Sequence, residues 1–420
     1  MILSNETIDI VVPILGEDDF ASPAHRKIFS AVRALHDDQR AVDLVTLRDE
    51  LKRRGDLEAV GGKEAVYQLT DSVPAAVNVE HYARIVREKA ITRNLLSAAR
   101  EIFDAASQDR TASRELLDNA QSRIFQIAER GTQGSVGPIK DALKAAFEQI
   151  DRGREGMLTG LATGFTDLDE MLSGLQPGEL IIVAARPSMG KTSLALNIAE
   201  HVGVHLQQPV ALFSLEMSRE QVARNMLCSH ARLDSHRMRR GRLTARERES
   251  LPHHVGTLSE APIFLDDSAS LNAFELRAKA RRIRANSGLS LLIVDYLQLM
   301  EGPSIDSREQ QISAISRNLK GLAREMGVPI IAVAQLNRQV ETRDDHRPRM
   351  ADLRESGSLE QDADVVLLLH RRGYYETDSD DQSAEVIVAK QRNGPTGKVP
   401  LTFLRQFMRF QNSTEGIRED

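Results

Sequence analysis

The sequence predicts an α/β fold, in which a mostly parallel sheet domain with a phosphate-binding loop follows a separate all-α N-terminal domain. From Gly164 onward, short apolar runs rich in β-branched residues alternate with helical stretches, which is typical of a parallel sheet. The first 130 residues carry only helix signals. The apolar run 181–183 leads directly into a loop that ends in Gly190. These three observations place any ligand chemistry in the sheet domain that follows the helical one.

Residues 1–130 are expected to form an all-α domain. Ser22 and Pro23 provide a helix start, Gly55 ends the stretch 43–54, and Asn78 opens a long helix that reaches about residue 108. Residues 111–129 could supply an antiparallel partner and complete a helical hairpin. No catalytic pattern occurs here, so we interpret this domain as an assembly or docking module.

Residues 131–160 are expected to form a linker that contains one short helix. Glycines flank the segment 139–150, whose apolar residues share one helical face: Ile139, Leu143, Phe147 and Ile150. A 12-residue helix is marginal alone and needs a surface to pack on. That surface could belong to a neighbouring subunit or to the same chain.

Residues 161–420 are expected to form the sheet domain. Its predicted strands are Glu179–Ala184, Pro209–Leu215, Pro262–Leu265, Leu291–Val294, Pro329–Ala334, Asp364–Leu369 and Glu385–Ala389. In such sheets the ligand binds at the carboxyl ends of the strands.

The loop after the first of these strands fits the pattern A/G-x4-G-K-[ST], from Ala185 to Thr192. Gly190 allows the backbone to close around a phosphate, and Lys191 can reach the β and γ oxygens. The Thr192 hydroxyl is a ligand for Mg²⁺. The remaining residues predicted to bind the nucleotide are Ser188, Met189 and Ser193. Nucleotide hydrolysis is therefore the first hypothesis.

Three further strand ends carry polar side chains. Asp295 ends an apolar strand, where a carboxylate can hold Mg²⁺ beside the phosphate loop; a solvated strand end is the alternative. Glu216 is the candidate general base for the attacking water, unless it only stabilises a helix N-terminus. Gln335 could sense the γ-phosphate, or it could be an ordinary surface amide.

Two basic features lie further along the chain. Arg392, with Lys390, follows a predicted strand, and a guanidinium inserted in cis or from another subunit can stabilise phosphoryl transfer. Residues 337–357 contain five arginines, interspersed with acidic residues that include Glu341, Asp344, Asp345 and Asp352. Such a loop is usually only solvated, but several copies around a channel could follow a polyanion.

Composition limits the class of protein. The formal net charge is −6, aromatic residues make up 4% and tryptophan is absent, so phosphate contacts are favoured over base stacking for any nucleic-acid binding. Cys228 is the single cysteine, which excludes an internal disulfide and a Cys-based zinc module. No apolar run approaches 18 residues. We therefore expect a cytoplasmic protein with no membrane association.

Taken together, these motifs resemble the DnaB family of bacterial replicative DNA helicases, which carry a RecA-like motor domain. The resemblance covers nearly the whole chain and rests on segments that occur in the family's order: 185–192, 213–218, 291–298, 310–322, 335–338, 352–364 and 389–397. The chain starts near the point where the first helix of the family's collar is expected to be under way.

The resemblance implies a homohexamer that binds ATP and Mg²⁺ between subunits, holds single-stranded DNA centrally and unwinds forked duplexes. Lys191, Thr192, Glu216, Asp295 and Gln335 would act in one subunit, and Arg392 with Lys390 would come from the next. Arg354, Glu355 and Gly357 would contact the DNA backbone. The N-terminal domain would be the collar, associated with primase, and the helix 139–150 would dock on the adjacent subunit. A helicase loader is a further expected partner.

Two alternatives stay open on the residues alone. A recombination ATPase of the RecA or RadA kind would share the core motifs, although RadA proteins are expected to carry a four-cysteine zinc module. A non-catalytic nucleotide-binding scaffold is expected to lack Glu216 or Arg392, and both are present.

Overall fold

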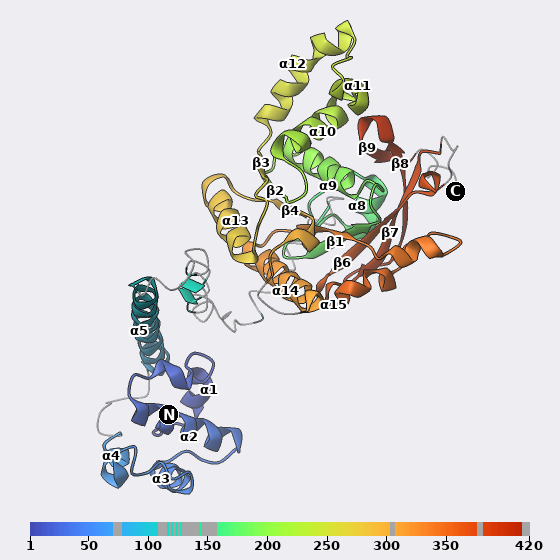
Figure 1. Cartoon of the computed structure of the whole chain (residues 1–420). Helices are drawn as coiled ribbons and strands as arrows, with labels where there is room; N and C mark the ends of the chain where they lie inside the picture. Colours follow the sequence, from blue (N-terminus) through green and yellow to red (C-terminus); the bar gives the residue numbers. More distant parts are fainter. Residues whose placement is uncertain are drawn as a thin grey trace. The chain divides into compact units, whose positions relative to one another are not determined.

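We describe a computed structural model of the chain, which covers residues 1–69, 78–107, 158–302, 307–375 and 381–413, with a few further residues between 116 and 143. The chain divides into two compact units, residues 1–137 and 138–420 (Figure 1). Each unit is described by itself.

The N-terminal unit is all-α in its described part, as predicted. Its helices are α1 (Glu6–Val11), α2 (Pro23–Asp37), α3 (Leu44–Arg53), α4 (Gly62–Gln68) and the long α5 (Val79–Ser107). The core is formed by apolar side chains of α1, α2 and α3 that are essentially inaccessible to solvent: Ile8, Phe29, Val32, Leu35, Leu47 and Leu51.

The helix starts of this unit follow the sequence signals only in part. Asp43 caps α3, because its carboxylate accepts hydrogen bonds from the backbone of Val45 and Thr46, both at 2.8 Å. Ser22 precedes α2 as predicted, but its hydroxyl makes no capping bond. The predicted hairpin partner 111–129 and the linker helix 139–150 lie outside the described residues, apart from a few isolated positions.

The C-terminal unit is built on one nine-stranded sheet with the order β3-β2-β4-β5-β1-β6-β7-β8-β9. Its strands are β1 (Leu180–Ala185), β2 (Val210–Ser214), β3 (Ile263–Asp266), β4 (Leu291–Asp295), β5 (Ile330–Gln335), β6 (Val365–His370), β7 (Ser383–Gln391), β8 (Gly397–Leu404) and β9 (Arg409–Asn412). The pairs from β3 to β6 are parallel, and the pairs from β6 to β9 are antiparallel.

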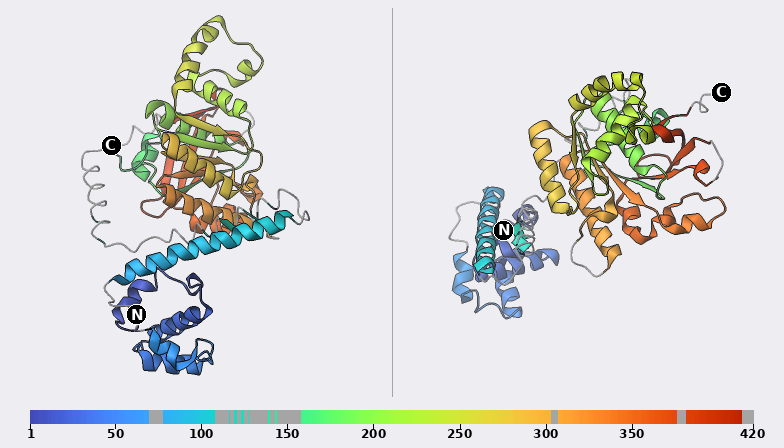
Figure 2. Two further views of the ribbon diagram at one scale, coloured as in Figure 1. Left: turned by 90° about the vertical axis from the view of Figure 1, so that its left-hand side faces the viewer. Right: turned by 45° about the horizontal axis from the view of Figure 1, so that its top comes forward.

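Helices cover both faces of this sheet (Figures 1 and 2). One face packs on α8 (Thr166–Leu172), α9 (Lys191–Glu200) and α10 (Arg219–Ala231), and the other on α13 (Ala273–Ser287), α14 (Arg308–Met326) and α15 (Gly357–Asp362). Two further helices, α11 (Ser235–Arg239) and α12 (Ala245–Glu260), follow α10. All six residues of β1 are buried, which explains its continuous apolar sequence.

All seven predicted strands exist, with ends that differ by at most two residues. β8 and β9, which extend the sheet beyond β7 by antiparallel pairing, were not predicted from the sequence. On β8, Val399, Leu401 and Phe403 are buried whereas Pro400 is exposed. This alternation is the signal that could have identified the strand.

In the part of the chain that the structure describes, every helix is too short or too polar to cross a lipid bilayer.

Candidate nucleotide-hydrolysis site

The loop between β1 and α9 has the backbone conformation expected of a phosphate cradle. Gly190 occupies the N-cap position of α9 with a φ of 98°, a conformation that L side chains rarely adopt. A Cβ at this position would lie 3.0 Å from the Phe410 ring, so backbone and packing both require glycine. The free N–H groups of the first turn of α9 can therefore receive an anion.

Lys191 begins α9 and is 7% exposed. Its ammonium nitrogen lies 4.1 Å from the centroid of the Tyr296 ring. Burial lowers the pKa of Lys191, and the carboxylates of Asp295 and Glu216 oppose this shift. The side chain is a desolvated cation with two acidic neighbours. It is therefore suited to bind an anion that carries more charge than a single carboxylate, such as a phosphate group.

Asp295 ends β4 and is 3% exposed. Burial raises the pKa of its carboxyl, whereas a hydrogen bond with Thr192 and the charge of Lys191 act in the opposite direction. Its Oδ1 atom is buried and has no hydrogen-bond partner among the described residues. A buried carboxylate with an open oxygen, next to a hydroxyl, is a donor set that fits Mg²⁺.

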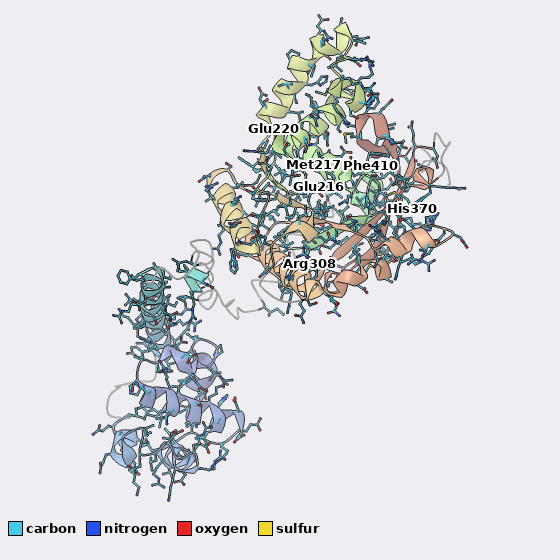
Figure 3. The ribbon with its side chains drawn as sticks, in the orientation of Figure 1. Glu216, Met217, Glu220, Arg308, His370 and Phe410 are labelled. Atoms are coloured by element: carbon cyan, nitrogen blue, oxygen red, sulfur yellow. The ribbon has the colours of Figure 1, made fainter. Side chains whose placement is uncertain are left out.

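Glu216 and Gln335 lie at the same edge of the sheet. Glu216 follows β2 in an exposed bend (Figure 3), which is closed by the Ser214 hydroxyl donating to the Met217 carbonyl at 2.7 Å. Gln335 is the exposed last residue of β5, and its backbone N–H donates to Gln298 Oε1 at 3.3 Å. The carboxyl ends of β1, β2, β4 and β5 are neighbours in the sheet, which brings these side chains and Lys191 to one edge.

Lys390 and Arg392 lie at the opposite edge. Lys390 pairs with Val366 near the start of β6, and its ammonium donates to the Ala363 carbonyl at 2.7 Å. The guanidinium of Arg392 donates to the Gln361 carbonyl. Both cations thus bind carbonyls at the C-terminal end of α15, a favourable place for positive charge. The structure does not bring them to the phosphate loop of their own chain.

The predicted DNA contacts lie between β5 and α15. Arg354 and Glu355 belong to a 3₁₀ segment, η6 (Met350–Ser356), and Gly357 begins α15. The side chains of 354–358 are outside the described set. The buried Asp352 fixes the start of this segment, since its carboxylate accepts hydrogen bonds from the Arg343 guanidinium and from the backbone of Arg349.

The residues that pack against the phosphate loop were not predicted from the sequence. Phe403 and Phe410 pack with ring centroids 4.3 Å apart, and the guanidinium of Arg371 lies 4.3 Å from the Phe403 centroid. Arg371 also donates to the Ser188 carbonyl at 3.3 Å. Because β8 and β9 were not predicted, nothing in the sequence indicated that these two aromatic rings pack against Gly190.

Comparisons with known proteins agree with this architecture. The family model described as the DnaB-like helicase C terminal domain matches residues 160–412, and the DnaB-like helicase N terminal domain matches residues 1–88. The chain belongs to the DnaB-like helicase family. The expectation from sequence is therefore confirmed, and the RecA- or RadA-like recombination ATPase is no longer a competing identification.

Named members of the DnaB-like family are similar over most of their length. The chain is 46% identical to the replicative DNA helicase DnaB of Geobacillus stearothermophilus, with 95% of this chain and 89% of that protein covered. It is 43% identical to the replicative DNA helicase DnaC of Bacillus subtilis strain 168, with 98% and 91% covered.

Solved DnaB-like structures show the same fold. One, described as a DnaB-like replicative helicase and its interactions with primase, has a TM-score of 0.74 at 32% identity and covers 98% of this chain and 97% of its own. A second, described as an ATPase domain, has a TM-score of 0.63 at 38% identity, and the match covers 66% of this chain and all of that domain.

Proposed function

We propose that this replicative DNA helicase hydrolyses ATP at the loop between β1 and α9, and that it works as a ring of identical subunits. The hydrolysis drives movement along single-stranded DNA and the unwinding of a forked duplex. The observation that carries the proposal is the group of Lys191, Thr192 and Asp295, in which a buried cation and a buried carboxylate with an unbonded Oδ1 lie together at the N-terminus of α9.

The residues of one subunit have distinct roles in this reaction. Backbone N–H groups from Ser188 to Ser193 hold the phosphates, and Lys191 neutralises charge on the β and γ oxygens. Bound Mg²⁺, held by Thr192 and Asp295, would polarise the phosphate oxygens.

Glu216 is the proposed general base. It takes a proton from a water molecule whose oxygen attacks the γ-phosphorus, and the bond to the β–γ bridging oxygen breaks to release ADP. The exposure of Glu216 at the strand edge leaves it accessible to such a water. Gln335, at the end of the nearby strand β5, is positioned to respond to the γ-phosphate.

Arg392 and Lys390 would complete the site of an adjacent subunit. Their position at the amino end of β6 and β1 prevents them from acting on their own phosphate loop, but it exposes Arg392 at the edge of the unit. In related phosphoryl transfers, a guanidinium supplied by a neighbouring subunit raises kcat by roughly 10³- to 10⁵-fold. The proposed homohexamer would meet this requirement for a neighbour.

The remaining assignments concern partners and domain roles. Arg354, Glu355 and Gly357 would contact the backbone of single-stranded DNA, since they occupy the segment that leads from β5 into α15. Residues 1–130 would form the collar and the primase-binding surface, and residues 131–160 the linker, before the ATPase domain 161–420. A similar solved structure is described with its interactions with primase. A helicase loader would place the ring on DNA.

Two assays on the full-length protein test this function. ATP hydrolysis should depend on Mg²⁺ and rise with single-stranded DNA, and the protein should displace one strand of a forked duplex. A nucleotide-binding scaffold would hydrolyse nothing. Hydrolysis without strand displacement would contradict the helicase assignment.

A further inference from the structure

Arg186, the first residue after β1, connects the phosphate loop to the segment that carries the predicted DNA contacts. Its side chain is 8% exposed, and its Nη1 donates to the Leu336 carbonyl at 2.7 Å. Its Nε donates to Glu341 Oε1 at 2.9 Å. A buried guanidinium requires such partners, because an unpaired buried charge is strongly unfavourable.

Both partners of Arg186 lie just beyond Gln335. Leu336 is the next residue, and its backbone N–H donates to the Ala185 carbonyl at 3.1 Å. Glu341 belongs to the 3₁₀ segment η5 (Arg338–Thr342). Arg186 therefore fixes the exit of β5, where the proposed γ-phosphate sensor lies, and the segment that follows it.

From Glu341, contacts continue to the predicted DNA-binding residues. Arg343 forms a bidentate ion pair with Asp352, and the Asn337 N–H donates to the Asp352 carbonyl at 3.0 Å. Asp352 is 1% exposed and lies two residues before Arg354. Residues 337–352 thus form a closed loop whose two ends are tied at Asp352.

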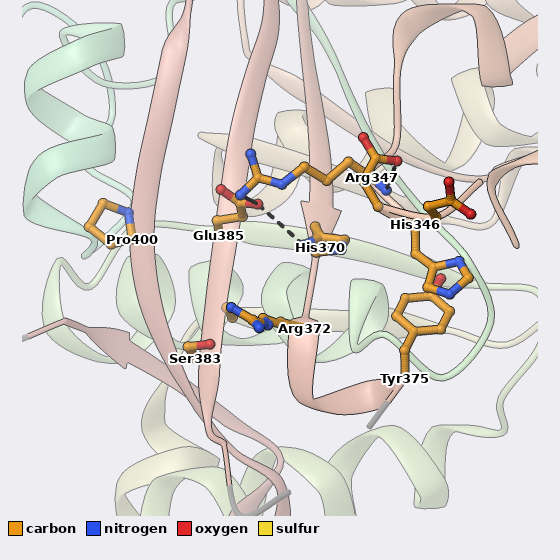
Figure 4. Close-up of a pocket in the computed structure, with 11 residues that line it drawn as sticks. His346, Arg347, His370, Arg372, Tyr375, Ser383, Glu385 and Pro400 are labelled. Atoms are coloured by element: carbon orange, nitrogen blue, oxygen red, sulfur yellow. Dashed lines mark hydrogen bonds and ion pairs between the residues drawn. The ribbon is translucent and has the colours of Figure 1, made fainter. Parts of the chain in front are cut away.

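The outer side of this loop contacts β7 and the segment that follows β6 (Figure 4). Arg347 pairs with Glu385 at 2.8 Å, and the His346 ring stacks on the Tyr375 ring at 4.2 Å. These residues line a cavity of about 650 Å³. The loop is therefore held on one side by Arg186 and on the other by Glu385 and Tyr375.

We propose that the contact of Arg186 with Glu341 and the Leu336 carbonyl transmits the nucleotide state of the phosphate loop to the DNA-binding segment. Arg186 is a positioning residue in this account and does not touch the reacting atoms. The inference rests on the proposed ATPase and DNA-binding function, and it names the connection between those two sites.

The test measures thermodynamic coupling. The affinity of the full-length protein for a fluorescent oligo-dT is measured with and without a non-hydrolysable ATP analogue and Mg²⁺, and the ratio of the two dissociation constants is the coupling factor. By linkage, DNA must change the affinity for the analogue by the same factor. A contact that only supports the fold would not change this ratio selectively.

The informative variant is Glu341→Gln, because the Glu341 side chain is 44% exposed and its replacement removes one charge from a residue outside the phosphate loop. We expect the coupling factor to fall at least about three-fold towards one, while DNA-free ATP hydrolysis stays within about two-fold of wild type. Asp344→Asn is the matched control. It removes the same charge from the same loop, and Asp344 has no ion pair among the described residues, so the coupling factor should not change.

Arg186→Lys provides a second variant that keeps the charge but loses the two-armed geometry. It should lower the coupling factor too. A variant that carries both Glu341→Gln and Arg186→Lys should have a coupling factor no lower than that of the more affected single variant, since the two substitutions disrupt the same contact. A wild-type coupling factor in Glu341→Gln, or equal losses with and without the analogue, would overturn the inference. Absence of ATP hydrolysis in the wild type would instead overturn the proposed function.

Discussion

Lys191 and Arg392 lie at opposite ends of the same strand. Lys191 follows the carboxyl end of β1, whereas Arg392 lies beside its amino end. Asp364 connects Arg392 to that end: its carbonyl accepts a hydrogen bond from the Arg392 backbone N–H at 2.9 Å, and its side chain accepts one from the N–H of Leu180, the first residue of β1. Six residues of extended chain place these ends roughly 17 Å apart. One subunit therefore cannot bring both cations to one phosphate group.

Lys191→Ala should abolish ATP turnover, with a loss of at least about 10²-fold, because the ammonium is the buried cation whose charge acts on Asp295 in the phosphate site. The fold should persist, since an alanine is compatible with the first turn of α9. Lys398→Ala, which alters an exposed lysine on β8, is the control. Near wild-type hydrolysis by the Lys191 variant, measured as phosphate release, would refute the site assignment.

Arg354→Ala should weaken binding to single-stranded DNA and leave DNA-free ATP hydrolysis nearly unchanged. If the guanidinium contacts one phosphate, the slope of log affinity against log salt should decrease by about 0.7. Titrations at several salt concentrations give both quantities. An unaltered affinity at moderate salt would remove Arg354 from the DNA interface.

The pH dependence of kcat/KM for Mg-ATP should report the buried carboxyl of Asp295. Its folded-state pKa is raised by burial, so the carboxyl takes up a proton at a higher pH than an ordinary aspartate as the solution is acidified. The protonated form cannot hold the metal, and kcat/KM should fall on the acidic side above the usual aspartate range.

Additional Mg²⁺ should move this acidic fall to lower pH, since the metal and the proton compete for the same oxygen. Recovery of activity after return to neutral pH distinguishes titration from unfolding. A profile that stays flat through the usual aspartate range, at any Mg²⁺ concentration, would contradict this role of Asp295.

The sequence was sufficient to predict the parallel half of the sheet and the polar residues at its carboxyl edge. Fully buried parallel strands are continuous apolar runs, and Asp295 and Gln335 end such runs, so both strand and side chain were recognisable. The antiparallel strands β8 and β9 were not predicted. β8 is interrupted by Pro400, and β9 has only four residues.

Contacts between segments that are distant in the sequence could not be predicted from it. Arg186 resembles any loop arginine until β5 places Leu336 and Glu341 beside it, 150 and 155 residues further along. The packing of Phe403 and Phe410 under Gly190 likewise depends on the register of β8 with β9. Such pairs are set by tertiary packing, which local periodicity does not encode.

The central claim, that each hydrolytic site is shared between two subunits, is tested most directly by mixing two inactive variants. Lys191→Ala lacks the phosphate-loop cation, and Arg392→Ala lacks the guanidinium. When the two proteins are allowed to assemble together at equal concentrations, roughly one subunit boundary in four should combine an intact loop with an intact arginine. We predict that ATP hydrolysis returns to about that fraction of the wild-type rate. A mixture that stays as inactive as either variant alone, despite exchange of subunits, would contradict the account.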